Sequence, residues 1–233
     1  MANKVKWLGH AGFEIVTGGN KRILIDPWIT GNPSAPVGKE DIQKPDLILL
    51  THDHFDHLCE DIPYLVKDSN ATILTQPEVI QKLKEIGVDD NNIVFGGMGM
   101  NIGGSVEVEG IKATMVQAFH SAVVGSPCGF VIKTEDGKNI YHAGDTGVFS
   151  SMKLIGEMYP LELALLPIGS VFVMDPLQAA FAVEMLRPKK VVPMHHRTFP
   201  ILVQDEEEFK KLTKERAPQT EVIVLNPGEE TEY

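Results

Sequence analysis

The stretch that decides the fold is residues 46–57, which read DLILLTHDHFDH. It opens with a short apolar run, Asp46 to Leu50, of the kind found in strands that are buried on both faces. Three histidines and two aspartates then follow within six residues. Because α/β proteins usually place their sites at the carboxyl ends of strands, and because imidazole and carboxylate suit Zn, Mn, Fe or Ni, the stretch predicts a metal-binding loop. The alternative is a solvated polar loop that happens to be rich in histidine.

The spacing within this loop divides its ligands into two pairs. His52 and His54 are two residues apart and can face one centre, whereas Asp56 and His57 are expected to begin a helix and to face another. One loop therefore offers two ligands to each of two metal ions. The chain has only two cysteines, Cys59 and Cys128, which argues against a closed structural zinc site. We expect both to be reduced and to pack as small core residues.

Outward from this loop, strand patterns alternate with helical ones, and two groups of strands are each followed by βα units. This order predicts an α/β fold of two similar halves, each a sheet covered by helices on one face. In the last helix, two pairs, Glu206/Lys210 and Glu207/Lys211, stand at the i,i+4 spacing of ion pairs on a helix surface. Strands are expected at 5–8, 13–16, 22–25, 46–50, 72–75, 112–118, 129–134, 139–142, 163–168, 190–194 and 221–225, the last of which closes the chain; helices are expected at about 56–67, from Pro77 to before Gly87, and at 148–159, 176–186 and 205–216.

Composition narrows the class of protein. A chain of 233 residues with 43% apolar and 23% charged residues is typical of one compact globular domain, here residues 1–233. The net charge of −11 disfavours nucleic acid as a partner. The N-terminus lacks a signal-peptide pattern, and Pro167 and Gly169 interrupt the longest apolar stretch, 163–174. We therefore expect a soluble cytoplasmic protein without an integral membrane segment, acting on a small-molecule substrate; a homo-oligomer is left open.

The pattern His-x-His-x-Asp-His at 52–57 resembles the signature of the metallo-β-lactamase superfamily. Further motifs of that superfamily follow in order, at Asp26, His120, Asp145 and His195. The resemblance implies a four-layer αββα sandwich. It narrows to a branch of small metal-dependent hydrolases similar to ascorbate-6-phosphate lactonase and, more distantly, to N-acyl-phosphatidylethanolamine phospholipase D. The segments that carry this narrower likeness are 7–13, 26–28, 167–169, 174–176, 194–195 and 198–200, and the departure from it is His196, where the branch more often has Tyr.

The resemblance also implies a ligand set for two divalent metal ions, Zn first, with Mn, Fe or Ni as alternatives. Such a pair would supply a bridging hydroxide that attacks a carbonyl or phosphoryl centre. Asp56 and Asp145 are the implied catalytic residues, and Asp56 would orient or deprotonate the water. The implied ligands are His52, His54 and His120 on one ion, and Asp56, His57 and His195 on the other, with Asp145 bridging both.

Five further residues are candidates for supporting the ligands or for contacting the substrate. Asp26 either holds a ligand histidine or initiates the turn before Pro27. His10 is either a packing residue or a site residue, and Asp175 is either a helix N-cap or a residue near the metals. His196 and Arg197 follow a predicted ligand and are candidates for contacting an anionic substrate. His142, in a strand pattern, is expected in the core or behind the ligands.

The function predicted from these residues is metal-dependent hydrolysis of a lactone or a phosphoester. A phosphodiesterase-like or phospholipase-like activity is the nearest alternative. A di-iron redox protein on the same fold is a second one, although its iron-type members carry a carboxylate at the position of His54. A metal-stabilised binding module without turnover is a third, against which the presence of Asp56 and Asp145 argues.

Overall fold

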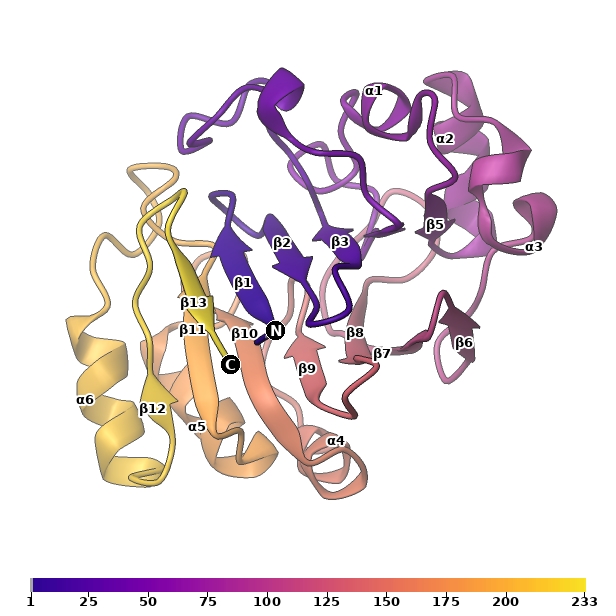
Figure 1. Ribbon diagram of the computed structural model, residues 1–233. Coiled ribbons are helices and arrows are strands. Elements are labelled where there is room, and N and C mark those ends of the chain that lie inside the picture. The colour runs from indigo at the N-terminus through magenta and orange to yellow at the C-terminus, as the bar shows by residue number, and fades with distance from the viewer. Residues whose placement is uncertain (1) are drawn as a thin grey trace.

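The computed structural model describes residues 2–233 and consists of two β-sheets packed face to face (Figure 1). In spatial order, the first sheet contains β13 (Glu230–Glu232), β1 (Lys4–Trp7), β2 (Phe13–Val16), β3 (Arg22–Ile25), β4 (Leu47–Leu49) and β5 (Thr72–Leu74). The second contains β12 (Glu221–Val222), β11 (Lys190–Met194), β10 (Leu161–Pro167), β9 (Asn139–His142), β8 (Cys128–Lys133), β7 (Ile111–Gln117) and β6 (Ser105–Val108).

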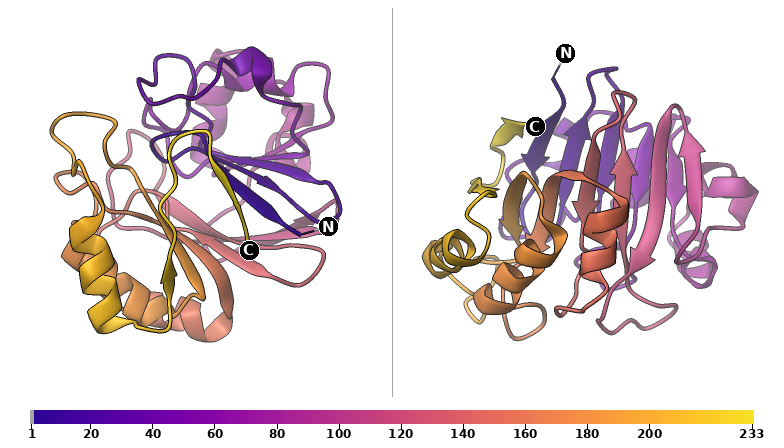
Figure 2. Two further views of the ribbon diagram at one scale, coloured as in Figure 1. Left: turned by 60° about the vertical axis from the view of Figure 1, so that its left-hand side comes forward. Right: turned by 90° about the horizontal axis from the view of Figure 1, so that it is seen from below.

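Helices lie on the outer faces of both sheets (Figure 2). The first sheet is covered by α1 (Ile62–Val66) and α2 (Ile80–Glu85), with α3 (Val94–Gly97) nearby at its edge. The second is covered by α4 (Met152–Met158), α5 (Pro176–Leu186) and α6 (Glu207–Arg216). The order helices, sheet, sheet, helices confirms the predicted four-layer fold with two similar halves. Nowhere between residues 2 and 233 is a helix both long and apolar enough to cross a bilayer.

The alternation of side chains along each strand builds three apolar layers. In β4, Leu47 and Leu49 point into the core between the sheets, whereas Ile48 points outward under α1 and α2. In β10, Leu165 packs between the sheets and Leu166 packs under the helices of the second half. Both strands are buried on both faces, which the apolar run after Asp46 predicts for β4.

Strand direction brings the predicted site motifs to one edge of the sandwich. Strands β3 and β4 are parallel, so the segments after them, which begin with Asp26 and lead into His52, emerge side by side. Strands β9, β10 and β11 are also parallel, so Asp145 and His195 emerge at one edge of the second sheet. Because the carboxyl ends of parallel strands share an edge, motifs far apart in the sequence converge there.

The predicted helix over 56–67 is wrong in its first half. Residues 54–58 form a tight turn instead, because the N–H groups of His57 and Leu58 both donate to the carbonyl oxygen of His54. Asp61 then uses its carboxylate to accept hydrogen bonds from the backbone of Ile29 and Thr30, at 3.3 and 2.7 Å. Only Ile62–Val66 is left to form α1.

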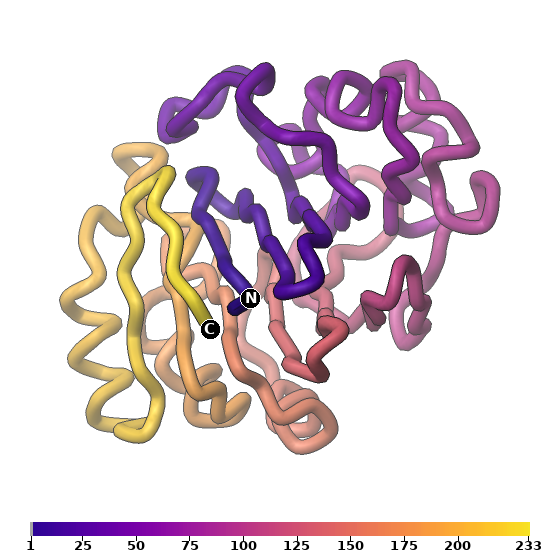
Figure 3. Tube along the Cα trace, viewed as in Figure 1, coloured from indigo at the N-terminus to yellow at the C-terminus, as the bar shows by residue number. Residues whose placement is uncertain are grey.

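Two strands were missed by the sequence analysis, and one changes where the chain ends. β6 pairs with β7, and β13 pairs with β1 in the register Lys4↔Glu232. The predicted last strand over 221–225 is shorter, since β12 has only two residues, and the chain then crosses back to the first sheet. The two termini consequently lie side by side (Figure 3).

Candidate metal centre

The loop after β4 and the loop after β7 together form one group of nitrogen ligands. The Nε2 atom of His52 lies 3.0 Å from Nδ1 of His54, and the rings of both residues lie 5.1 Å from that of His120. One nitrogen from each of the three imidazoles falls within 4.8 Å of the others. Burial lowers the pKa of His52 to about 3, so this imidazole is neutral and has a lone pair available for a metal ion.

A second group lies beside the first and mixes imidazole with carboxylate. It contains Asp56, His57, His195 and His10, whose ligand atoms also lie within 4.8 Å of one another. Asp56 and His57 project into this second group from a turn and not from a helix, and His57 also lies within 4.8 Å of His52 and Asp145, which joins the two groups.

Asp145 lies between the two groups. Its Oδ2 atom is 3.5 Å from Nε2 of His120, 3.3 Å from Nε2 of His57 and 3.1 Å from Nε2 of His195. Burial by itself would raise the pKa of this carboxyl group, but His195 and His57 hold the pKa well below its usual value. A carboxylate with three imidazoles around it can contact cations on both sides.

Two buried polar atoms in this region are explained better by a bound metal ion than by contacts within the protein. Within residues 2–233, neither Nε2 of His57 nor Oδ1 of Asp145 has a hydrogen-bond partner. Native proteins rarely leave buried polar atoms unsatisfied without a water or an ion. The ligand atoms are nitrogen and oxygen, since Cys59 and Cys128 are buried elsewhere, with their Sγ atoms near the carbonyl oxygens of Pro27 and Thr51. This donor set suits a divalent cation such as Zn²⁺ or Mn²⁺.

A buried carboxylate orients His57 from behind. Asp26 places Oδ2 at 2.7 Å from Nδ1 of His57, so that Nε2 of the ring faces Asp145. Thr51 fixes Asp26 in turn, because its N–H and its hydroxyl group donate to the two carboxylate oxygens at 2.9 and 2.6 Å. Burial lowers the pKa of His57, but Asp145 and Asp26 outweigh it and raise the pKa well above the usual value.

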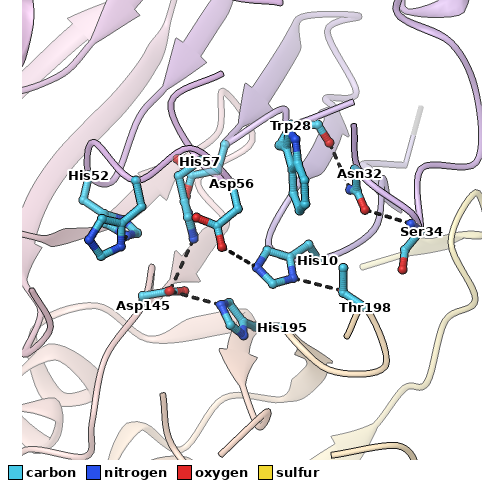
Figure 4. A network of polar contacts seen from close by, with 12 residues as sticks. His10, Trp28, Asn32, Ser34, His52, Asp56, His57, Asp145, His195 and Thr198 are labelled. Atoms are coloured by element: carbon cyan, nitrogen blue, oxygen red, sulfur yellow. Dashed lines mark hydrogen bonds and ion pairs between the residues drawn. The ribbon is translucent and has the colours of Figure 1, made fainter. Parts of the chain in front are cut away.

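His10 connects the second group to Thr198, in the loop after β11 (Figure 4). Its Nε2 atom lies 3.0 Å from Oδ2 of Asp56, and its Nδ1 atom lies 2.9 Å from the hydroxyl oxygen of Thr198. Burial lowers the pKa of His10 to about 4, even though Asp56 acts in the opposite direction. A neutral ring in this position donates to the carboxylate and accepts from the threonine, which fixes the orientation of Asp56.

Left-handed backbone conformations concentrate at this edge. His10, Asp26 and His195 have φ angles of 54°, 44° and 56°, which are uncommon for residues other than glycine. Gly144, before Asp145, has φ of 60°, and a Cβ atom there would lie 2.3 Å from the carbonyl oxygen of Cys128. The absence of a side chain at Gly144 therefore permits a close approach of two backbone segments.

A cavity of about 400 Å³ opens onto the two groups. The polar part of its lining includes His54, Asp56 and Asp145. The apolar part consists of three phenylalanines. A cavity of this size holds a small molecule.

Comparison with known proteins identifies the family of this chain. Residues 21–196 match the model of the "Beta-lactamase superfamily domain". A "UPF0173 metal-dependent hydrolase" from Caldivirga maquilingensis is 50% identical to the chain over 97% of it and 96% of that relative. The chain belongs to the UPF0173 metal-dependent hydrolases of the β-lactamase superfamily. The predicted superfamily is thereby confirmed, and with it the prediction of a metal-dependent hydrolase.

Another UPF0173 metal-dependent hydrolase, from Thermococcus onnurineus, is 49% identical over 97% of both chains. Among solved structures, Igni18, described as a novel metallo hydrolase from Ignicoccus hospitalis, is 37% identical. It superposes with a TM-score of 0.88 and covers 100% of this chain and 99% of its own. The likeness extends over the full length of this UPF0173 chain and includes all the loops that meet at the ligand groups.

Other predicted site residues of this UPF0173 chain lie outside the cavity. The Nε2 atom of His196 is 2.5 Å from Oε1 of Glu206, and its ring stacks on Trp7. Arg197 contacts the same Glu206 oxygen at 3.2 Å. Asp175 caps α5 by accepting a hydrogen bond from the N–H of Gln178 at 2.7 Å, which confirms the predicted N-cap.

His142 lies buried behind the site. Its Nε2–H donates to the carbonyl oxygen of Ala11 at 3.0 Å, and its Nδ1 accepts from the N–H of Gly144 at 3.1 Å. It therefore joins the first sheet to the turn that carries Asp145, in agreement with the prediction of a core residue or a residue behind the ligands.

One residue that the sequence analysis left without a role is Asp53, which lies inside the histidine motif itself. Its carboxylate accepts hydrogen bonds from the N–H groups of Val123 and Val124, at 2.8 and 3.0 Å, and pairs with Lys82. It thus ties the His52–His57 loop to the segment that follows His120. An acidic residue between two ligands was the available signal, but nothing in the sequence identifies its partners 70 residues away.

Proposed function

We propose that the chain hydrolyses an ester-type bond, in a lactone or a phosphoester, at a site that holds two divalent metal ions. The observation that carries this proposal is the position of Asp145, whose single carboxylate oxygen lies within 3.5 Å of imidazoles from both ligand groups. A carboxylate shared in this way suits two neighbouring cations better than one. The small cavity beside it supports a small-molecule substrate.

The residues that would hold the ions follow the two groups, except for His10, whose Nε2 atom contacts Asp56. When bound, the two cations would supply Lewis acidity, lowering the pKa of water and stabilising negative charge on the reacting oxygen. One ion would take His52, His54 and His120, the other Asp56, His57 and His195, and Asp145 would be shared.

The chain's own residues prepare this site for an incoming water and substrate. Asp56 faces the cavity as a carboxylate, and the hydrogen bond from His10 fixes its direction. It is placed to accept a hydrogen bond from water and to receive its proton. Asp26 holds His57 in one orientation, so the second group needs little rearrangement during the reaction.

The first experiment is elemental analysis of the protein purified without chelator, followed by hydrolysis assays on lactone, phosphodiester and thiolester substrates. We expect about two Zn or Mn ions per chain. Asp145→Asn and His54→Ala are expected to lose hydrolytic activity, while Asp205→Asn, at an exposed carboxylate outside the cavity, keeps it. Unchanged rates in the first two variants would refute the proposal. Two Fe ions with a visible absorption band and oxygen turnover would favour the di-iron alternative.

A further inference from the structure

Three phenylalanines form the apolar wall of the cavity. Phe55, Phe172 and Phe199 come from three separate loops, those after β4, β10 and β11. Phe55 is 68% exposed and Phe172 is 55% exposed, and both line the cavity. Large apolar side chains gathered and exposed at one place mark a binding surface.

Two of these phenylalanine rings pack against a buried tryptophan. Trp28, which is buried, contacts Phe55 with ring centroids 5.5 Å apart and Phe199 with centroids 6.2 Å apart. The loop that carries Trp28 is itself fixed, because the side chain of Asn32 donates to the carbonyl oxygen of Trp28 at 3.0 Å (Figure 4). The two phenylalanines are thus supported from behind and stay at the opening of the cavity.

The third ring is presented by a strained loop. Ser170 and Val171, directly before Phe172, have φ angles of 62° and 50°. For a β-branched residue such as Val171 this conformation is a genuine outlier. The loop is closed by a hydrogen bond from the N–H of Ser170 to the carbonyl oxygen of Met174, at 3.0 Å. Strain of this kind persists where the position of a side chain serves function.

The charge of the cavity wall is the second observation. Of the described residues that line it, none is Lys or Arg. Arg197, two residues after the lining residue His195, is the basic residue closest in sequence to the cavity lining. Its guanidinium group contacts Glu206 and the carbonyl oxygen of Leu225 instead. Apart from bound metal ions, the described residues that line the cavity therefore offer no Lys or Arg side chain to a carboxylate or phosphate group on the substrate. Recognition of such anions normally uses Arg or Lys.

From this wall we infer that the substrate is an uncharged carboxylic ester or lactone with an apolar alkyl or aryl group. The apolar group lies against Phe55, Phe172 and Phe199, and the carbonyl group faces Asp56 and Asp145. Water adds to the carbonyl carbon, the bond to the alkoxy oxygen breaks, and a proton passes to that oxygen, giving an acid and an alcohol from an ester or one hydroxy acid from a lactone. The inference rests on the proposed hydrolytic function and narrows it away from phosphoesters.

The test uses the metal-loaded full chain and a series of γ-lactones with alkyl chains of increasing length. A matched lactone whose chain ends in a carboxylate, and an aryl phosphate, complete the set. We expect kcat/KM to rise by up to about fourfold for each added methylene until the cavity is filled, mainly through KM. The carboxylate-bearing lactone and the aryl phosphate are expected to be poor substrates.

Phe172→Ala and Phe55→Ala are expected to reduce this dependence on chain length. Both side chains are largely exposed, so their truncation leaves the fold intact. Leu154→Ala is the matched control, because Leu154 is 55% exposed and lies on α4, outside the cavity. The control should keep the full dependence on chain length.

The inference is overturned if kcat/KM is independent of chain length, if the carboxylate-bearing lactone is preferred, or if both phenylalanine variants behave as the control does. Failure of the proposed function looks different, because then the metal-loaded protein hydrolyses none of the substrates. In that case calorimetry with uncharged alkyl lactams, which resist hydrolysis, decides the inference. Tighter binding of longer chains that is lost in Phe172→Ala would support it, and equal binding would overturn it.

Discussion

Replacing Asp53 by Ala should destabilise the protein strongly, although Asp53 is not a candidate ligand. The side chain is buried, and its carboxylate accepts two backbone hydrogen bonds, from Val123 and Val124, and pairs with Lys82. These contacts join the His52–His57 loop to the segment after His120. The substitution therefore tests whether a residue between two ligands fixes the relative position of the loops on either side.

The size of the effect follows from these contacts. A hydrogen bond to a charged group contributes about 1.5–3 kcal/mol, and a partly exposed ion pair contributes about 0–1 kcal/mol. The two N–H donors lie in a surface segment, where water can replace the lost acceptor, so the lower end of the first range applies. Asp53→Ala should then lower the free energy of unfolding by about 3 kcal/mol, and Lys82→Met by about 1 kcal/mol or less. For a chain of this size, 3 kcal/mol corresponds to a Tm lower by about 6–12 °C.

Guanidinium unfolding and thermal unfolding of the metal-free protein measure both values, and the double variant measures the coupling between them. Asp53→Asn, which keeps one acceptor oxygen, should fall between wild type and Asp53→Ala. We also expect weaker metal binding in Asp53→Ala, by about tenfold, because the loop that follows His120 loses its attachment. The reasoning is refuted if Asp53→Ala costs no more than Lys82→Met, since the backbone hydrogen bonds would then contribute nothing.

Three further predictions concern the stability of the protein. Gly144→Ala should lower the free energy of unfolding, measured in guanidinium, by about 2–4 kcal/mol, because its Cβ would lie 2.3 Å from the carbonyl oxygen of Cys128. Gly87→Ala is the control: a Cβ there meets no atom within 4 Å, and with φ of 98° the change should cost about 1 kcal/mol. Equal costs would contradict the importance of the close approach. Burial would raise the pKa of Asp61, but hydrogen bonds from Thr30 outweigh it and lower the pKa. The stability that Asp61 contributes is therefore complete above its unfolded-state pKa and is lost as pH falls through the lower folded-state value, so Asp61→Asn should flatten the acid limb of a stability–pH curve. Chelation of bound metal should lower the Tm, and adding the metal back should restore it. If the free ion is present at about a hundred times its Kd before chelation, the free energy of unfolding should fall by about 2.7 kcal/mol. A Tm unaffected by chelator and by added metal would count against a metal centre.

Much of the site was predictable because it depends on patterns formed by residues close together in the sequence. An apolar run followed by alternating histidines predicts a strand and a ligand loop, and the structure brings His52 and His54 together with nitrogen atoms 3.0 Å apart. The N-cap at Asp175 was predictable for the same reason, since it depends on Gln178, three residues further along the chain. The helix predicted to begin at Asp56 failed where a turn uses the backbone donors of residues 57 and 58.

The sequence by itself determined most of the strands, the ligand loop and the motifs at the strand ends, because these depend on periodicity and on residues close together in the chain. Only the tertiary structure decided which side chains meet across the two halves. It placed His10 between Asp56 and Thr198, and it buried Glu206 against His196 when helical spacing had predicted a surface pair with Lys210. It also gathered three phenylalanines from separate loops into one wall. Such meetings depend on how two sheets pack and on where their loops converge, and no local pattern in the chain encodes that geometry.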